Sequence, residues 1–137
     1  MSARGKARKR ALDIVFEADA KSVPIVMVLG EHQRRREADG DGALNEYAVV
    51  IAQGVSDHLD EIDALITKNS TSWTLDRMPT VDRAILRVAT FELLFNDSVP
   101  DAVVVSQAVE LAKELSTDES ASFVHGVLGA ISRASIS

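Results

Sequence analysis

Residues 79–95, PTVDRAILRVATFELLF, place apolar side chains at intervals of three and four residues. This spacing is typical of an α-helix that buries one face. Pro79 suits the first turn of such a helix, because a proline nitrogen has no proton that needs a partner there. The stretch therefore predicts a helix that lies in the core. Its apolar positions are Val81, Ile85, Val88, Ala89, Phe95 and either Phe91 or Glu92.

The same periodicity extends over most of the chain. A bend or a close helix crossing at Gly54 would divide the longest helical region into two helices. Residues 38–43, ADGDGA, predict a loop. The chain is therefore predicted to be all-α, with six or seven helices. Besides the helix after Pro79, we expect helices over residues 6–21, 24–35, 47–66, 100–115 and 123–131.

Length and composition narrow the class of protein. The 137 residues suit a single domain over residues 1–137, and 46% of them are hydrophobic, which disfavours disorder of the whole chain. The absence of cysteine excludes disulfides, thiolate zinc sites and a cysteine nucleophile. The longest early apolar run, residues 23–29, is too short for a signal peptide or a membrane span. We therefore expect a cytoplasmic protein that has no membrane partner.

Charge is distributed unevenly along the chain. Residues 1–10 contain five cations and no acid, whereas the other 127 residues contain ten Lys or Arg and 21 Asp or Glu. A basic arm that leads into the first helix can neutralise nucleic-acid phosphates and release counterions. A solvated, frayed terminus is the alternative. The cations of the arm are Arg4, Lys6, Arg8, Lys9 and Arg10.

A second basic run, residues 34–36, consists of three arginines. Glu31, Glu37, Asp39 and Asp41 lie beside it and largely cancel its charge. The run is interpreted as the solvated end of a helix that enters a loop, with a nucleic-acid contact as the alternative.

Motifs for catalysis are missing from the sequence. His32, His58 and His125 are dispersed, and none forms an HExxH pair, so no metal site is predicted. The sequence has neither a GxxxxGK[ST] nor a GxGxxG phosphate loop, and no serine stands in a GxSxG elbow. We therefore expect a protein that is not an enzyme and has no cofactor.

Residues 73–94, WTLDRMPTVDRAILRVATFELL, resemble the NusB family of transcription antitermination factors. The similarity continues at residues 99–100, over residues 108–120 and at FVHGVL, residues 123–128. The segment from residue 7 to residue 16 is similar to the family's basic first helix. The motifs stand in the family's order and cover nearly the whole chain.

This resemblance implies an all-α fold of two small helical bundles packed across each other, and RNA binding without catalysis. Family members bind the boxA element of nascent ribosomal RNA together with NusE, a ribosomal protein of the small subunit. That complex joins the elongating RNA polymerase with other Nus factors and suppresses premature termination. The resemblance therefore implies boxA RNA, NusE and the polymerase elongation complex as partners.

Two positions depart from the family pattern. The family usually has Asn where this chain has His125, a larger side chain that still forms hydrogen bonds. It commonly has Tyr where this chain has Phe16, which keeps the aromatic ring and loses one hydroxyl. We expect ring packing or stacking at residue 16 to survive.

Candidate RNA-binding residues are the five cations of the arm together with Phe123 and Glu119. We expect Arg8, Lys9 and Arg10 to lie at an exposed helix start, where their replacement would not unfold the protein. Phe123 would stack on a base if exposed, or belong to the core through its spacing with Val127 and Ile131. Glu119 would accept from a base amino group or favour the helix start as an acid.

Asp76, Asp82 and Asp101 are the candidates for docking a basic ribosomal protein. Each lies near a predicted helix start, where an acid also complements the helix dipole. Asp82 and Asp101 are expected to be exposed in the first turns of their helices, directed toward the partner.

Two rival functions are weighed against antitermination. RNA cytosine methyltransferases can carry a NusB-like RNA-binding module, but this sequence has no cofactor loop. The other rival is a helical scaffold that self-associates, since an apolar surface left for a partner could also form a homodimer.

Overall fold

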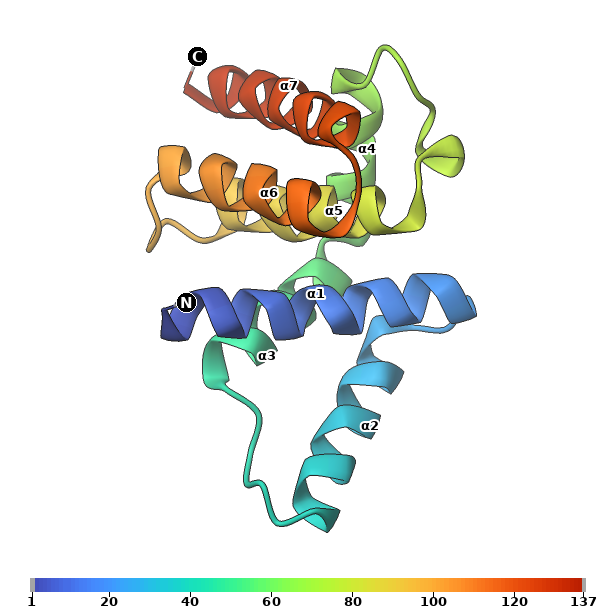
Figure 1. The fold of residues 1–137 in the computed structure, drawn as a ribbon, viewed down its shortest axis with the longest axis vertical. Helices are drawn as coiled ribbons and strands as arrows, with labels where there is room; N and C mark the ends of the chain where they lie inside the picture. The colour runs from blue at the N-terminus through green and yellow to red at the C-terminus, as the bar shows by residue number, and fades with distance from the viewer. Residues whose placement is uncertain (1, 137) are drawn as a thin grey trace.

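The computed structural model describes residues 2–136, so Met1 and Ser137, the ends of the predicted domain, lie outside it. Over the described range the chain forms seven α-helices and no β-strand, which confirms the predicted all-α class (Figure 1). A short 3-10 turn, η1 (Leu75–Arg77), precedes the fifth helix. The helices are α1 (Ala3–Lys21), α2 (Ile25–Ala38), α3 (Glu46–Asp57), α4 (Leu59–Asn69), α5 (Thr80–Phe95), α6 (Asp101–Leu115) and α7 (Asp118–Ile136).

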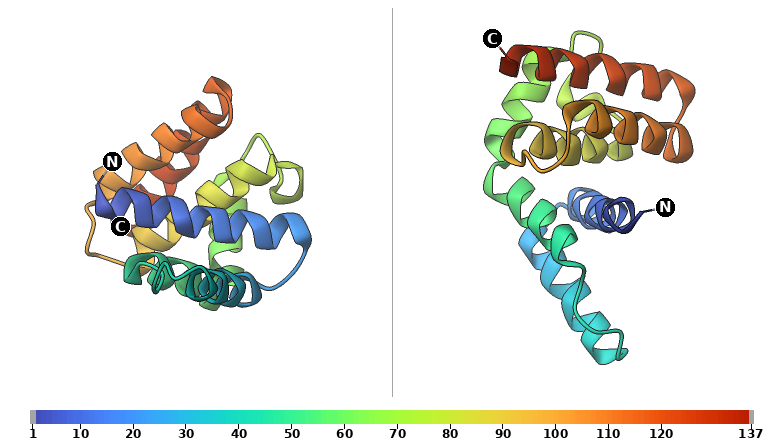
Figure 2. Two further views of the ribbon diagram at one scale, coloured as in Figure 1. Left: turned by 60° about the horizontal axis from the view of Figure 1, so that its bottom comes forward. Right: turned by 90° about the vertical axis from the view of Figure 1, so that its left-hand side faces the viewer.

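Helix α1 crosses the middle of the molecule, with α2 and α3 on one side of it and α4 to α7 on the other (Figure 1). The right-hand view of Figure 2 shows the same order with α1 seen nearly end-on. Helix α1 contacts α2 and α3 as well as α5. The first helix is therefore shared between the two groups of helices.

The break in the long third helical region lies at His58, where α3 ends and α4 begins. Of the two alternatives predicted at Gly54, the structure shows the close crossing, since Gly54 allows α3 to approach α5 closely. A Cβ atom built on Gly54 would lie 2.0 Å from Cε1 of Phe91. His58 stacks on Phe95 with ring centroids 3.9 Å apart.

The core is one continuous cluster that draws on all seven helices. The apolar stripe predicted on α5 is buried at Ile85, Val88 and Ala89. The sequence left open whether Phe91 or Glu92 belongs to the buried face, and in the structure both are buried. A buried glutamate inside an apolar stripe requires partners for its charge. These partners lie on α1 and α3.

Candidate nucleic-acid interface

Helix α1 begins earlier than its apolar spacing predicts, so the basic arm is itself helical. Ser2 caps the helix by accepting a hydrogen bond from the backbone nitrogen of Gly5 at 3.0 Å. The helical segment therefore includes all five basic positions, and their side chains point in different directions around one axis.

Arg8 is buried, and the prediction that it is exposed is wrong. Its guanidinium donates to both carboxylate oxygens of Glu92, with Nε–Oε1 at 2.6 Å and Nη2–Oε2 at 2.9 Å. The hydroxyl of Tyr47 donates to Oε2 of the same carboxylate at 2.7 Å. Arg8 lies four residues before Leu12 and seven before Val15, which are both buried, so it shares their face.

This network holds the charges of Arg8 and Glu92 within the protein. Its hydrogen bonds with Glu92 raise the pKa of Arg8. Burial, followed by the hydrogen bond to Glu92, raises the pKa of Tyr47 to about 12. Arg8 thus serves as a structural cation that is not available to phosphate. A Glu among apolar positions was the sequence signal for a buried cation.

Arg4 and Lys9 are exposed or partly exposed and engaged with neighbours. Arg4 donates Nη1 to the carbonyl oxygen of Ser98 at 3.1 Å and lies 4.7 Å above the ring of Tyr47. Lys9 pairs with Glu114 at 2.9 Å across to α6. An exposed ion pair of this kind is weak and screened by salt, so Lys9 can exchange Glu114 for another anion.

Lys6 and Arg10 are the open cations of the helix start. Across the described part of the chain, neither side chain has a hydrogen-bond or ion-pair partner. Lys6 is exposed and Arg10 is half-buried. Because they are four residues apart, they share one face of α1.

An apolar groove follows the next part of α1, where it meets the start of α5 and the end of α6. The groove has a volume of about 480 Å³. Phe16 and Leu115 line it and are 39% and 40% exposed. The ring at residue 16 is therefore accessible on the same helix as the open cations. Its other lining residues are Leu12, Asp13, Thr80 and Val81.

Phe123 and Glu119 lie in the first turns of α7. Phe123 is half-buried and packs edge-on against Trp73, with ring centroids 4.8 Å apart. Thr117 caps the helix, since its hydroxyl accepts from the backbone nitrogen of Ser120 at 3.0 Å. Glu119 is exposed in the first turn and forms no side-chain hydrogen bond among the described residues.

The predicted partner-binding acids do not form one surface. Asp76 is exposed in η1, and a hydrogen bond involving Thr74 lowers its pKa. Asp82 is fully buried, so the prediction that it is exposed and directed outward is wrong. It shares the buried face of α5 with Ile85 and Leu86, and neither of its carboxylate oxygens has a hydrogen-bond partner within residues 2–136. It cannot contact a partner protein directly.

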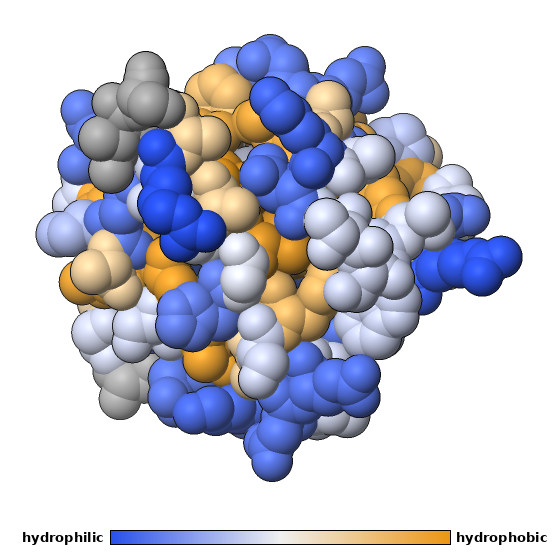
Figure 3. Space-filling view, turned by 90° about the horizontal axis from the view of Figure 1, so that it is seen from above, coloured by the Kyte–Doolittle hydropathy of each residue, from blue (hydrophilic) through white to orange (hydrophobic). Residues whose placement is uncertain are grey.

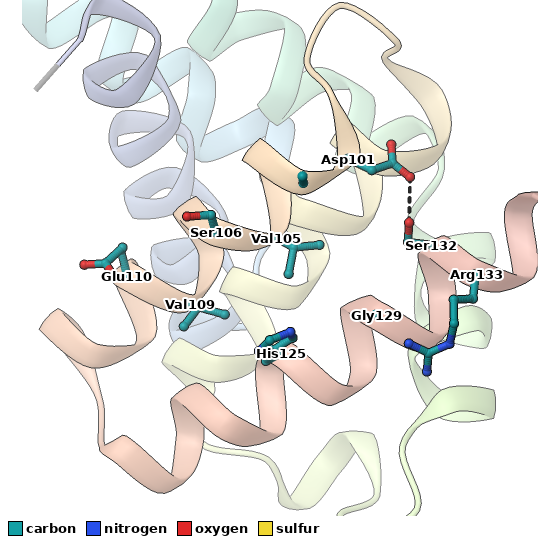
Figure 4. A pocket seen from close by; sticks show the side chains of 10 residues that line it. Asp101, Val105, Ser106, Val109, Glu110, His125, Gly129, Ser132 and Arg133 are labelled. Atoms are coloured by element: carbon teal, nitrogen blue, oxygen red, sulfur yellow. Dashed lines mark hydrogen bonds between the residues drawn. The ribbon is translucent and has the colours of Figure 1, made fainter.

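Asp101 lies after the far end of α5, at the start of α6. It is half-buried, and one carboxylate oxygen accepts a hydrogen bond from the hydroxyl of Ser132 at 2.7 Å (Figure 4). Both residues line a groove of about 570 Å³ between α6 and α7, which also includes Val105 and His125. His125 is exposed there. On the face seen from above α7, apolar side chains show between polar ones (Figure 3).

Two other kinds of site receive no support. The described residues include no group of three His, Asp or Glu side chains placed to hold a metal ion. Nε2 of His32 is instead 3.0 Å from Oε1 of Glu17, and this contact together with Lys21 lowers the pKa of Glu17. Within residues 2–136, no helix combines the length and apolarity needed to cross a membrane.

The chain is similar to proteins of one family over almost its whole length. Residues 5–133 match the profile of the NusB family. The transcription antitermination protein NusB of Arthrobacter sp. (strain FB24) is 54% identical over 129 residues, which cover 94% of this chain and 92% of that protein.

Solved structures agree with the sequence match. A structure of T. maritima NusB has a TM-score of 0.80 at 30% identity, covering 97% of this chain and 92% of that one. A crystal structure of the antitermination factors NusB and NusE in complex with double-stranded RNA matches with a TM-score of 0.75 at 28% identity, covering 96% of each chain. The chain belongs to the NusB family.

Proposed function

We propose that this protein binds the boxA element of nascent ribosomal RNA together with NusE and joins the elongating RNA polymerase to suppress termination. Its relatives are named for transcription antitermination, a role without catalysis, in agreement with the expectation that the chain is not an enzyme. The related structure of NusB and NusE in complex with RNA supports RNA and NusE as partners.

One observation carries the RNA-binding part of the proposal. Helix α1 presents two unpaired cations, Lys6 and Arg10, and further along its length an exposed aromatic ring, Phe16. Cations neutralise backbone phosphates, and aromatic rings stack on unpaired bases. The two kinds of contact lie on opposite flanks of α1, since Lys6 and Arg10 line a cavity toward α2 and Phe16 lines the groove toward α5 and α6. A single strand that crosses over α1 would therefore find both. Lys9 and Arg4 would add charge beside this path.

The residues at the start of α7 have a secondary role in this proposal. Phe123 has part of its ring exposed, so it can contact a base at its edge while it stays packed on Trp73. Glu119 is exposed and free to accept from a base amino group. For NusE, the exposed acid Asp76 and the half-buried Asp101 remain candidates, at separate places on the surface.

A boxA titration tests the proposal. The wild-type protein is expected to bind single-stranded boxA RNA more tightly than a scrambled RNA, and more tightly again with NusE present. Replacing Lys6 and Arg10 together by Gln should reduce the slope of log affinity against log salt by about 0.7, the value for one lost phosphate contact on a single strand. Lys68→Gln, an exposed change on α4, is the matched control.

Equal binding of boxA and scrambled RNA would contradict sequence-specific recognition. An unchanged salt slope in the double variant would remove α1 from the interface. For the polymerase, transcription through a terminator downstream of boxA should rise when protein and NusE are added together. No change in readthrough would contradict the antitermination role.

A further inference from the structure

In the sequence, neighbouring acids largely cancel the charge of the basic run at residues 34–36, but in the fold Arg36 also lines a cavity that none of those acids lines. We propose that a backbone phosphate of the bound RNA is held in a cavity between α1 and the loop after α2, by Lys6, Arg10 and Arg36. This inference rests on the proposed RNA binding and adds a second helix to the interface.

The cavity has a volume of about 250 Å³. Every charged residue that lines it is a cation: Lys6 and Arg10 from α1 and Arg36 from α2. Ala3 and Ala7 leave room between the long side chains because they end at Cβ. Three converging cations in a recess favour a phosphate oxygen over any neutral group.

Arg36 is held in place without losing its charge. Its Nη2 donates to the carbonyl oxygen of Asp41 at 2.7 Å, and its Nε donates to that of Gly42 at 3.3 Å. Gly42 has a φ of +77°, a conformation that side chains rarely adopt, so glycine suits this loop. Carbonyl acceptors orient a guanidinium but leave its positive charge intact, and other N–H groups of Arg36 remain free.

Asn45 adds a polar group at the edge of the same cavity. Its side-chain oxygen accepts from the backbone nitrogen of Tyr47 at 2.8 Å and caps α3. The amide nitrogen of Asn45 is therefore left to donate outward. The start of α3 contributes a favourable dipole for an anion beside the three cations.

An adjoining cavity shows why the phosphate is assigned to the first one. That second cavity, of about 200 Å³, shares Arg10 and Arg36 and also includes Arg35, but Asp39 and Asp41 line it too. Two carboxylates would repel a phosphate there. Two of the acids that offset the basic run, Asp39 and Asp41, therefore line only the second cavity and not the one that includes Lys6.

Arg36→Gln and Arg34→Gln test the inference as a matched pair. Both remove one positive charge from the same helix, but Arg34 is exposed and does not line the cavity. We expect Arg36→Gln to weaken binding of single-stranded boxA RNA about tenfold and to lower the salt slope by up to about 0.7. Arg34→Gln should change neither by more than a small fraction. Circular dichroism and thermal unfolding must show that both variants are folded.

A scan with neutral methylphosphonate linkages separates a phosphate contact from a loop distortion. One linkage in the RNA should weaken binding to the wild-type protein, and it should weaken binding to Arg36→Gln less, because only Lys6 and Arg10 still face that phosphate. If Arg36→Gln is as sensitive as the wild type at every linkage, or binds like Arg34→Gln, the cavity is not a phosphate site, although RNA binding stands. If the wild-type protein binds no RNA, the proposed function fails first and the cavity assignment fails with it.

Discussion

The two ends of α5 each bury a carboxylate, and they do so in opposite ways. Glu92, near the end of the helix, is 1% exposed and receives two hydrogen bonds from Arg8 and one from Tyr47. Asp82, in the first turn, is 0% exposed, and neither oxygen has a hydrogen-bond partner among the described residues. The same helix thus carries one satisfied buried acid and one unsatisfied buried acid.

The difference shows what a buried charge does for this fold. At Glu92 the acid links α5 to α1 and α3, so its partners fix how the two groups of helices meet. At Asp82 no side chain among the described residues bonds the carboxyl group, and the burial of an unpaired polar group is unfavourable. One end of α5 is therefore a structural junction, and the other is a local weak point.

Of the variants that test this contrast, Arg8→Ala should lower the free energy of unfolding most. It would leave Glu92 buried and without its cation, which costs about 3–5 kcal/mol of the free energy of unfolding. Urea denaturation measures the loss. Arg10→Ala, two residues away and without a side-chain partner, should stay within about 0.5 kcal/mol of the wild type. Equal losses for the two variants would contradict the assigned roles.

Tyr47→Phe should have a smaller effect on the same junction. The change removes the hydrogen bond that the hydroxyl donates to Glu92 and the one that it accepts from Asn96, and keeps the ring beneath Arg4, at a cost of about 1.5–3 kcal/mol. Thermal and urea unfolding of the two proteins at neutral pH give the difference. A variant as stable as the wild type would show that Arg8 alone satisfies Glu92.

Alkaline pH should sharpen the comparison further. Because folding raises the pKa of Tyr47 from 10.0 to about 12, the unfolded chain loses this proton first. The contribution of the protonated Tyr47 hydroxyl to the stability of the fold is complete below pH 10 and is lost as the pH rises toward 12. Across this pH window, the free energy of unfolding should fall more steeply for the wild type than for Tyr47→Phe. Parallel curves would contradict the burial of this hydroxyl, since lysines titrate equally in both proteins.

Asp82→Asn should have the smallest effect, with the opposite sign. Because the amide that replaces the buried carboxyl also has no partner there, the free energy of unfolding should stay unchanged or rise by up to about 1 kcal/mol. The measurement is again urea denaturation. A loss as large as that of Arg8→Ala would mean that Asp82 has a strong partner and that the contrast along α5 is false.

Local spacing was enough to predict most helices, because a buried stripe at three- and four-residue intervals depends only on nearby residues. It placed Ile85, Val88 and Ala89 correctly in the core. It could not predict that Arg8 is buried, since that depends on Glu92, 84 positions away. Asp82 was misplaced for a related reason: a helix start is usually exposed, but neighbouring helices cover this one.

The site was less predictable than the fold. Counting charges around Arg36 cancels it against four acids, yet the cavity that it lines with Lys6 and Arg10 contains none of them. For the ring of Phe16 the sequence left packing and stacking open, and the structure exposes the ring at a groove. Both outcomes depend on how side chains of different helices are placed relative to one another. The spacing of residues along the sequence contains no information about this placement.

Because α1 packs against α5, which comes much later in the sequence, α1 has to wait for its packing partner while the chain is synthesised. Arg8 is made 84 residues before the carboxylate that pairs with it. At a rate of about 5–20 residues per second, the gap lasts about 4–17 s. For that time the apolar face of the first helix waits for α5, and the nascent chain must keep it from unwanted contacts. Helix α1 is thus made before α5 but reaches its final packing only after α5 has been made.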